Sequence, residues 1–203
     1  MMITQKILRK IAKVLLPYIQ REESKAHSRG LINLSSKMKN CSTSLYMGNC
    51  YEVWGEEYIE IGAGFTAAKH FRLEAIDKYG EQKFSPQIRI GNNVSFQDYC
   101  HVGAIERIEI GDGCMFASKV FITDHYHGPI DKTELNKAPG LRTLISKPVV
   151  VGKNCWIGDG VCILPGVTLG NNVIVGANAV VTHSFPEDSV IAGCPAKIIK
   201  MLE

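Results

Sequence analysis

A six-residue repeat constrains this chain more than any other feature of its sequence. From Val151 the sequence reads VGKNCW, IGDGVC, ILPGVT, LGNNVI, VGANAV and VTHSFP, and every hexad begins with an aliphatic residue. The second position is often Gly, and the fifth is small or apolar in every hexad. Earlier copies start at Ile90 and Ile110, and a degraded copy starts at Ile61. A pattern that recurs over more than half of the chain has to describe its main architecture.

The hexads predict short strands joined by turns. A helix has a period of 3.6 residues and a half-buried strand a period of 2, and neither matches. The first residue of each hexad can point inward and the fifth can fill a corner, while Gly, Asn or Asp between them accept turn conformations. Three hexads close one triangular coil, and stacked coils bury a continuous apolar column. We therefore expect an all-β parallel β-helix. The alternative is an α/β protein with many Gly turns. It is disfavoured because residues 88–190 contain no segment with a helical period.

Breaks in the repeat define the predicted organisation of the chain. Residues 1–29 look helical, and residues 30–190 form the β-helix domain. Within that domain, residues 77–87 look like a loop and residues 128–147 form a long polar insertion with two prolines. Long insertions in compact domains are more often functional than accidental. In the tail, residues 191–203, we expect a turn at Pro195 followed by a short helix.

Composition excludes several classes of function. The net charge of +3 over 203 residues is too small to indicate nucleic-acid binding. No segment approaches the ~18 consecutive apolar residues of a membrane span. The seven cysteines include no CxxC pair, which disfavours a zinc site or a disulfide framework and fits free thiols in a reducing cytosol. We expect a cytoplasmic protein.

The first twenty residues predict an amphipathic helix with basic residues outside its apolar face. Two roles are open for it. It can pack on the β-helix or on an oligomer, or it can dock reversibly on an anionic membrane, at the inner face of which the protein would then be peripheral. The apolar positions are Ile3, Ile7, Leu8, Ile11, Val14, Leu15 and Tyr18, and the basic ones are Lys6, Arg9, Lys10 and Lys13.

Three stretches resemble the hexapeptide-repeat acetyltransferases: ITDHYHG at 122–128, VGKNCWIGDGVCILPGVTLGNNVIVGANAVVT at 151–182, and AGCPAKIIK at 192–200. The resemblance covers about residues 59–201. It is greatest to the galactoside and maltose O-acetyltransferases and to the O-acetyltransferases of capsular polysaccharide biosynthesis. The resemblance implies a left-handed β-helix, a homotrimer, acetyl-CoA as co-substrate, and a sugar or glycan acceptor. It also implies a CoA site between neighbouring β-helices, with the insertion reaching across it.

His125 is the candidate catalytic base. It stands at the mouth of the insertion, and an imidazole titrates near neutral pH, so it can take a proton from an alcohol. In the resembling enzymes the histidine before such an arm is the base. Asp124 and His127 are candidates for orienting His125: His127 shares its face if the chain stays extended, whereas Asp124 reaches it only if the chain turns. His101, at the last position of its hexad, is expected at the surface or on the acceptor side.

Two further residues are candidates for the acceptor site through the resemblance. A Trp at the position of Trp156 borders the reacting groups in polysaccharide O-acetyltransferases, although burial against the next coil would also suit an indole. Gln97 stands where galactoside acetyltransferases carry an acceptor-binding Asn, and its amide could bond a sugar hydroxyl. The change from Asn to Gln leaves the identity of the acceptor open.

Five residues match family positions that contact CoA. The family often has Arg at the two lysine positions, and we expect a short helix to place both lysines on one face, toward the CoA phosphates. Asp159 departs from the family's Ser. The five residues are Asp159, Ala177, Thr182, Lys197 and Lys200.

We therefore expect an acetyl-CoA-dependent O-acetyltransferase. The alternatives are N-acetylation of a nucleotide-linked amino sugar and a non-catalytic β-helix scaffold. We expect no metal, because His125 and His127 are separated by one residue, whereas the zinc-binding histidines of a related β-helix family are separated by four. Cys100, Cys114 and Cys155 fall at corner positions, where a thiol acts as a small hydrophobe rather than a nucleophile.

Overall fold

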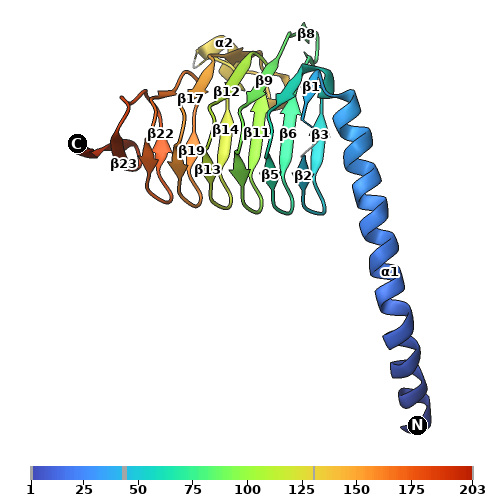
Figure 1. The fold of residues 1–203 in the computed structure, drawn as a ribbon. Coiled ribbons are helices and arrows are strands. Elements are labelled where there is room, and N and C mark those ends of the chain that lie inside the picture. Colours follow the sequence, from blue (N-terminus) through green and yellow to red (C-terminus); the bar gives the residue numbers. More distant parts are fainter. Residues whose placement is uncertain (1, 43–44, 130, 203) are drawn as a thin grey trace.

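The computed structural model describes residues 2–42, 45–129 and 131–202, and its main body is a triangular prism of stacked coils. The chain visits three parallel sheets in turn, one strand per sheet and coil (Figure 1). The predicted parallel β-helix is therefore confirmed. Because each strand pairs with the strand one coil before and one coil after it, residues far apart in sequence stand side by side along each face.

The prism has three faces, and each is one sheet; the chain reaches the first, second and third sheets in that order within every coil. The first sheet contains β1 (Asn40–Cys41), β4 (Ile59–Ile61), β9 (Gln87–Ile90), β12 (Arg107–Ile110), β17 (Val149–Val151) and β20 (Thr168–Leu169). The second contains β2 (Tyr46–Met47), β5 (Thr66–Ala67), β10 (Ser95–Phe96), β13 (Met115–Phe116), β18 (Trp156–Ile157), β21 (Ile174–Val175), β23 (Ser189–Gly193) and β24 (Ala196–Met201). The third contains β3 (Glu52–Trp54), β6 (Arg72–Ala75), β11 (His101–Ala104), β14 (Phe121–Thr123), β19 (Cys162–Ile163) and β22 (Val180–Val181).

The hexad positions have the predicted roles. First residues point into the prism and are buried, and fifth residues fill its corners. The rings of Phe96 and Phe116, from consecutive coils, stack 4.2 Å apart in the interior. Burying one such large apolar side chain is worth about 1.5–3 kcal/mol, so the column is the main source of stability. The buried first residues include Ile61, Ile90, Ile110, Val151, Leu169, Leu73, Val102, Ile122, Ile163 and Val181.

The N-terminal helix, α1 (Met2–Lys37), continues past residue 29, the predicted end of the helical segment. Its last turns bury Leu31 and Leu34 against the first coil, and this contact explains the extra length. The His27 imidazole also bonds the main-chain oxygen of Met47 at 2.6 Å. The rest of α1 points away from the prism (Figure 1). No helix among the described residues is long and apolar enough to cross a membrane.

The C-terminal tail is a strand, and the predicted short helix is wrong. β24 turns back at Pro195 and pairs antiparallel with β23, extending the second sheet by one strand. The main-chain N–H and C=O groups of β23 at the end of the prism need hydrogen-bond partners. A strand supplies them, whereas a helix bonds its main-chain groups to one another. Lys197 and Lys200 nevertheless share a face, because a register shift pairs them with Ala192 and Val190, which stand two residues apart.

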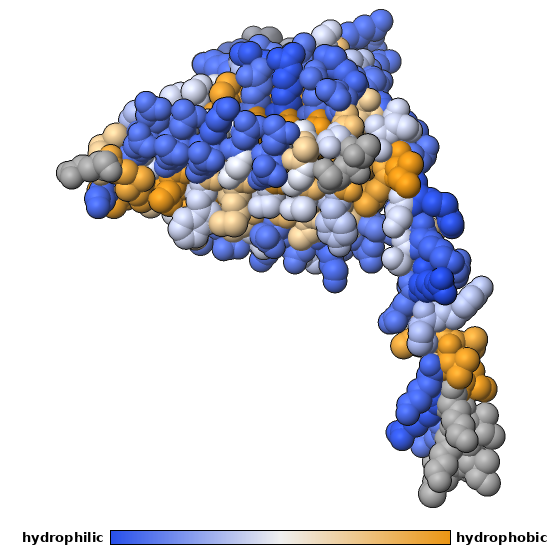
Figure 2. All heavy atoms as spheres, viewed as in Figure 1, coloured by the Kyte–Doolittle hydropathy of each residue, from blue (hydrophilic) through white to orange (hydrophobic). Residues whose placement is uncertain are grey.

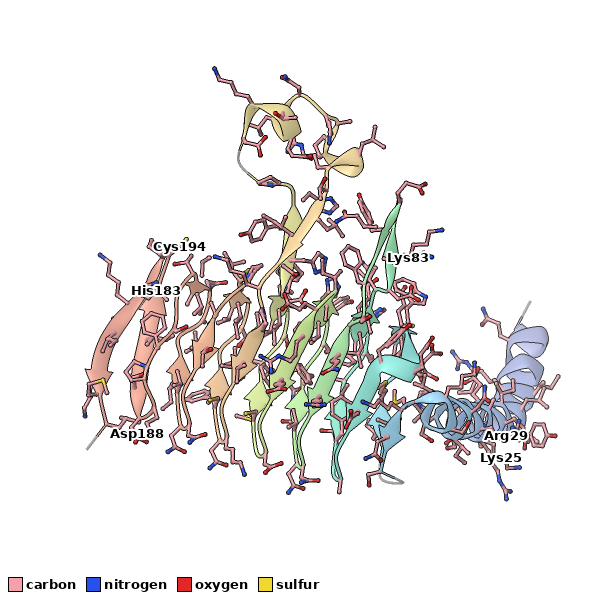
Figure 3. The ribbon with its side chains drawn as sticks, turned by 90° about the horizontal axis from the view of Figure 1, so that it is seen from above. Lys25, Arg29, Lys83, His183, Asp188 and Cys194 are labelled. Carbon is pink, nitrogen blue, oxygen red and sulfur yellow. The ribbon has the colours of Figure 1, made fainter. Side chains whose placement is uncertain are left out.

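Two excursions leave the prism on one side (Figure 3). The predicted loop at 77–87 contains a hairpin of β7 (Lys78–Tyr79) and β8 (Gln82–Lys83). The predicted insertion is an arm that starts and ends with β15 (His125–His127) and β16 (Leu144–Ser146), and it carries α2 (Lys132–Leu135) and the 3₁₀ helix η2 (Pro139–Leu141). A second 3₁₀ helix, η1 (Glu56–Tyr58), precedes β4. Gln82 joins hairpin to arm, bonding the main chain of Leu144 at 2.7 and 3.1 Å.

Candidate active site

His125 lies at the root of the arm, directly after the third sheet. Its Nδ1 is 2.9 Å from Oδ1 of Asp124 and 3.2 Å from Oγ1 of Thr123. The carboxylate can only accept, so Nδ1 donates its proton to Asp124. A neutral imidazole with its proton on Nδ1 has a lone pair on Nε2, the form needed in a base.

Asp124 is fully buried, and it is held more firmly than an ordinary loop carboxylate. The main-chain N–H groups of Ile105, Glu106 and Arg107 donate to it at 2.9, 2.7 and 2.7 Å. With these three bonds the Asp124 side chain caps the turn at residues 105–107 of the preceding coil. The chain bends at Asp124, and this bend brings the carboxylate within hydrogen-bond distance of the His125 ring. Asp124 therefore fixes both the tautomer and the position of the imidazole.

The other nitrogen of His125 has no hydrogen-bond partner in the part of the chain that the structure describes, and the side chain is 14% exposed. His127 does not orient it. The ring of His127 packs edge-on against Tyr79, 5.4 Å away, and its Nδ1 lies 3.4 Å from the Tyr79 hydroxyl. The structure thus assigns the orienting contact to Asp124 and places His127 between the arm and the β7–β8 hairpin.

Glu74 belongs to the same face, although it was not among the site residues predicted from the sequence. The sheet register sets Glu74, Gly103 and Thr123 side by side, at the second position of three aligned hexads. Glu74 bonds Nε2 of His101 at 2.7 Å, and His101 lies two residues before Gly103. Extending the hexad register from Ile61 to residue 78 would have revealed this alignment, because Leu73, Val102 and Ile122 are its first positions.

Three of the predicted site residues share one corner of the prism, between the second and third sheets. The corner turns stack through main-chain hydrogen bonds, from Lys119 to Asp98 at 2.8 Å and from Asn178 to Asp159 at 2.7 Å. One such turn comes from each coil, at a spacing of about 4.8 Å. The three residues at this corner are Gln97, Asp159 and Ala177, and all are exposed.

The remaining candidates lie elsewhere. Trp156 stands on the outer face of the second sheet and is 52% exposed, so it is not buried against the next coil. Lys197 and Lys200 are exposed on β24 of the same sheet. Thr182 follows β22 at the corner from which the arm leaves, and its hydroxyl contacts His183 at 3.2 Å. In one chain, then, the residues around His125 and most of the expected CoA contacts occupy different faces.

The corner cysteines are buried, as predicted. Burial raises the pKa of the Cys100 thiol to about 11. A thiol with that pKa stays protonated at neutral pH and is a poor nucleophile. Within the described ranges, no three His, Cys, Asp or Glu side chains are grouped so that they could hold a metal ion.

Comparison with known proteins identifies the family. Residues 148–183 match the family described as "Bacterial transferase hexapeptide (six repeats)". The chain is 44% identical over 155 residues to the "Putative lipopolysaccharide biosynthesis O-acetyl transferase WbbJ" of Escherichia coli K12, covering 74% of this chain and 75% of the relative.

Solved structures agree on the fold. A maltose O-acetyltransferase from Clostridium difficile 630 superposes with a TM-score of 0.55 at 26% identity, over 93% of this chain and 89% of the other. AntD, an N-acyltransferase from Bacillus cereus crystallised with dTDP and 3-hydroxybutyryl-CoA, superposes with a TM-score of 0.63 at 18% identity, over 91% and 88%. The long match to WbbJ, together with the coiled hexads, shows that this chain belongs to the hexapeptide-repeat acyltransferases.

Proposed function

We propose that this acyltransferase moves an acetyl group from acetyl-CoA to a hydroxyl of a sugar or glycan, with His125 as the general base. The observation that carries the proposal is the His125–Asp124 pair. Nδ1 of His125 is bonded at 2.9 Å to the fully buried carboxylate of Asp124, and Nε2 of His125 is left to accept a proton from a substrate. The 44% identity to WbbJ supports an O-acetyl acceptor and a role in polysaccharide biosynthesis.

The chemistry follows from that pair. Nε2 takes the proton of the acceptor hydroxyl as its oxygen attacks the thioester carbonyl. The imidazolium that forms is stabilised by Asp124, and the CoA thiolate leaves with little assistance. No protein nucleophile takes part, so both substrates are bound together and no acyl-enzyme forms.

A transfer screen tests this function. The purified protein is incubated with acetyl-CoA and a panel of methyl glycosides, free sugars and nucleotide-linked amino sugars, and products are read by mass spectrometry. We expect a mass gain of one acetyl group on a neutral sugar, in a linkage that mild base cleaves, as it does an ester. A base-stable product on an amino sugar would support N-acylation, the reaction named for AntD. A panel without product would contradict both.

We further propose that the coils are left-handed and that three copies assemble side by side. In one chain His125 lies at the root of the arm, whereas Lys197 and Lys200, two of the expected CoA contacts, lie on β24 of the second sheet. One CoA molecule would reach both His125 and these lysines where two copies meet. The outer face of the second sheet also carries an apolar row that a neighbour would cover. Light scattering should give the mass of three chains; the mass of a single chain at micromolar concentration would contradict the assembly. The row is Met115, Trp156, Ile174 and Val190.

Lys197 and Lys200 are proposed contacts for the CoA phosphates. Their exposed ammonium groups share one face of β24, which is the arrangement that a polyphosphate needs. Replacing both by alanine should raise the KM for acetyl-CoA about tenfold and weaken its dependence on salt, because surface charge pairs are screened by ions. The control replaces Lys25 and Lys37 of α1. An unchanged KM in the Lys197/Lys200 variant would show that these residues do not bind CoA.

The free part of α1 is the proposed contact with an anionic membrane. Ile11, Leu15 and Tyr18 are 47%, 49% and 64% exposed, and they lie on a helix that leaves the prism. Hydrophobic and hydrophilic spheres occupy different sides of this stretch in Figure 2. Residues 1–21 contain five Lys or Arg and no Asp or Glu, so the charge suits anionic lipid rather than another copy of the same helix.

Sedimentation with vesicles tests the membrane contact. The protein should pellet with phosphatidylcholine vesicles that contain about 30% phosphatidylglycerol, and not with pure phosphatidylcholine. Leu15→Glu should abolish this binding, because it puts a charge on the apolar face. Gln20→Glu, an equal charge change on another side of α1, should reduce it only slightly. Equal binding by both variants, or binding that survives deletion of residues 1–20, would disprove the contact.

A further inference from the structure

A second His–carboxylate pair stands beside the one used above. His101 Nε2 is 2.7 Å from Glu74 Oε2, and the Glu74 side chain is only 8% exposed. His101 opens β11 of the third sheet, and His125 follows β14, the strand that pairs with β11 in the next coil. Two histidines, each bonded to its own carboxylate, therefore stand next to each other on this side of the prism.

Several contacts hold the Glu74–His101 pair in place. Arg72 donates to Glu74 at 2.7 Å, and the ring of His101 packs against Phe121 with 5.2 Å between ring centres. Burial raises the pKa of the Glu74 carboxyl, but the hydrogen bonds and positive charges of His101 and Arg72 together lower it by more, so the pKa lies below its ordinary value. The carboxylate therefore stays ionised at neutral pH and keeps Nε2 of His101 bonded. Nδ1 of that ring has no hydrogen-bond partner among the described residues.

Gly103 keeps a space open between the two histidines. A β-carbon at this position would lie 3.3 Å from His101 Nε2, 3.8 Å from His125 Cε1 and 3.9 Å from Glu74 Oε2. Both rings thus border the same glycine, whose φ does not lie in the left-handed region. Backbone conformation does not require glycine here, so the requirement is for space.

We propose that His101, held by Glu74, binds a second hydroxyl of the acceptor next to the hydroxyl that His125 deprotonates. The inference rests on the proposed function and narrows its substrate class to sugars with a free neighbouring hydroxyl. His101 would then be a specificity residue, and Gly103 would make room for the sugar ring over the sheet. A site built to bond a hydroxyl rejects analogues that lack it, because its own polar group is left unpaired.

A purely structural role for His101 predicts different kinetics. If the pair only braced the third sheet, replacing His101 would lower stability and would change kcat and the two KM values together or not at all. An acceptor-binding role affects the KM for the acceptor, and not the KM for acetyl-CoA. The separation of these constants is therefore the decisive measurement.

The experiment uses the sugar that the wild type acetylates fastest in the panel above, and its deoxy analogues. His101→Gln should raise the acceptor KM about tenfold, the scale of one lost hydrogen bond, with kcat within about threefold. Gly103→Ala should raise it in the same way by filling the space. The KM for acetyl-CoA should stay unchanged in both. His70→Asn, at an exposed histidine in a corner turn, is the matched control.

Deoxy analogues give a second, independent readout. Loss of the neighbouring hydroxyl should weaken the sugar about tenfold for the wild type and hardly at all for His101→Gln, because the contact is already gone. An unchanged acceptor KM in His101→Gln, or the same deoxy penalty in both proteins, would overturn the inference and leave the proposed function intact. If the wild type acetylates no sugar, the proposed function fails and the inference fails with it.

Discussion

His125→Ala is expected to lower kcat by ~10²–10⁴, the usual contribution of a general base. The acceptor hydroxyl would have to attack without transferring its proton to Nε2. The proposed trimer assembly and the KM for acetyl-CoA should remain close to wild type, because among the described residues the His125 side chain forms hydrogen bonds to Thr123 and Asp124 alone. Steady-state kinetics with the acceptor from the screen provide the measurement.

His127→Ala is the control for that variant. His127 stands two residues away on the same strand, but it contacts Tyr79 rather than the imidazole of His125. Its loss should reduce kcat much less than the loss of His125. Near-normal turnover in His125→Ala would show that His125 is not the general base. Equal losses in both variants would indicate that the arm as a whole, and not one imidazole, supports the reaction.

Asp124→Asn is expected to have the second large effect, through the tautomer of His125. The amide oxygen of Asn can replace the carboxylate oxygen that faces the main-chain N–H groups of Glu106 and Arg107. The amide nitrogen then donates to Nδ1 of His125, so the imidazole proton moves to Nε2 and the base is lost. A comparable substitution in serine proteases lowers kcat by ~10⁴, and we expect a loss of ~10² or more here.

The same variant should also be less stable. Asp124 is fully buried, and removing its charge weakens three main-chain hydrogen bonds at once. We expect the free energy of unfolding to fall by about 2–4 kcal/mol in urea denaturation. Asp112→Asn is the matched control, because Asp112 also accepts a main-chain N–H, that of Asn92 at 2.8 Å, but its side chain is 42% exposed. If Asp124→Asn kept wild-type turnover, the tautomer argument would be wrong.

The hexads predicted most of the fold because one local rule generates it. An aliphatic first position and a small fifth position determine which residues of each hexad point inward. Stacking of similar coils then builds the prism and its buried column. The ends did not obey that rule. The tail looked helical on local propensity, but the unpaired edge of β23 made a strand the better partner for residues 196–201. Such an edge exists only after the prism has formed, so the sequence of the tail alone does not reveal it.

The site was predictable in part. His125 stood out because the repeat stops there, and Asp124 was its neighbour in sequence. Its orienting contact depends on the main-chain N–H groups of residues 105–107, one coil earlier, which donate to the Asp124 carboxylate. Glu74 was missed for a related reason, since it meets His101 only through the register between β6 and β11. Contacts between coils depend on the register of the strands, so they can be predicted only once every hexad has been assigned to its coil.

The closure of the arm at its base has an evolutionary consequence. The main-chain N–H of Lys147 donates to the oxygen of Asp124 at 2.8 Å, so the excursion returns to the point from which it left. β17 then pairs with β12 as the next turn of an uninterrupted coil. Residues 128–143 can therefore change in length or chemistry without shifting the register of the prism. A lineage could exchange this segment while the folding of the column and the placement of His125 are inherited unchanged.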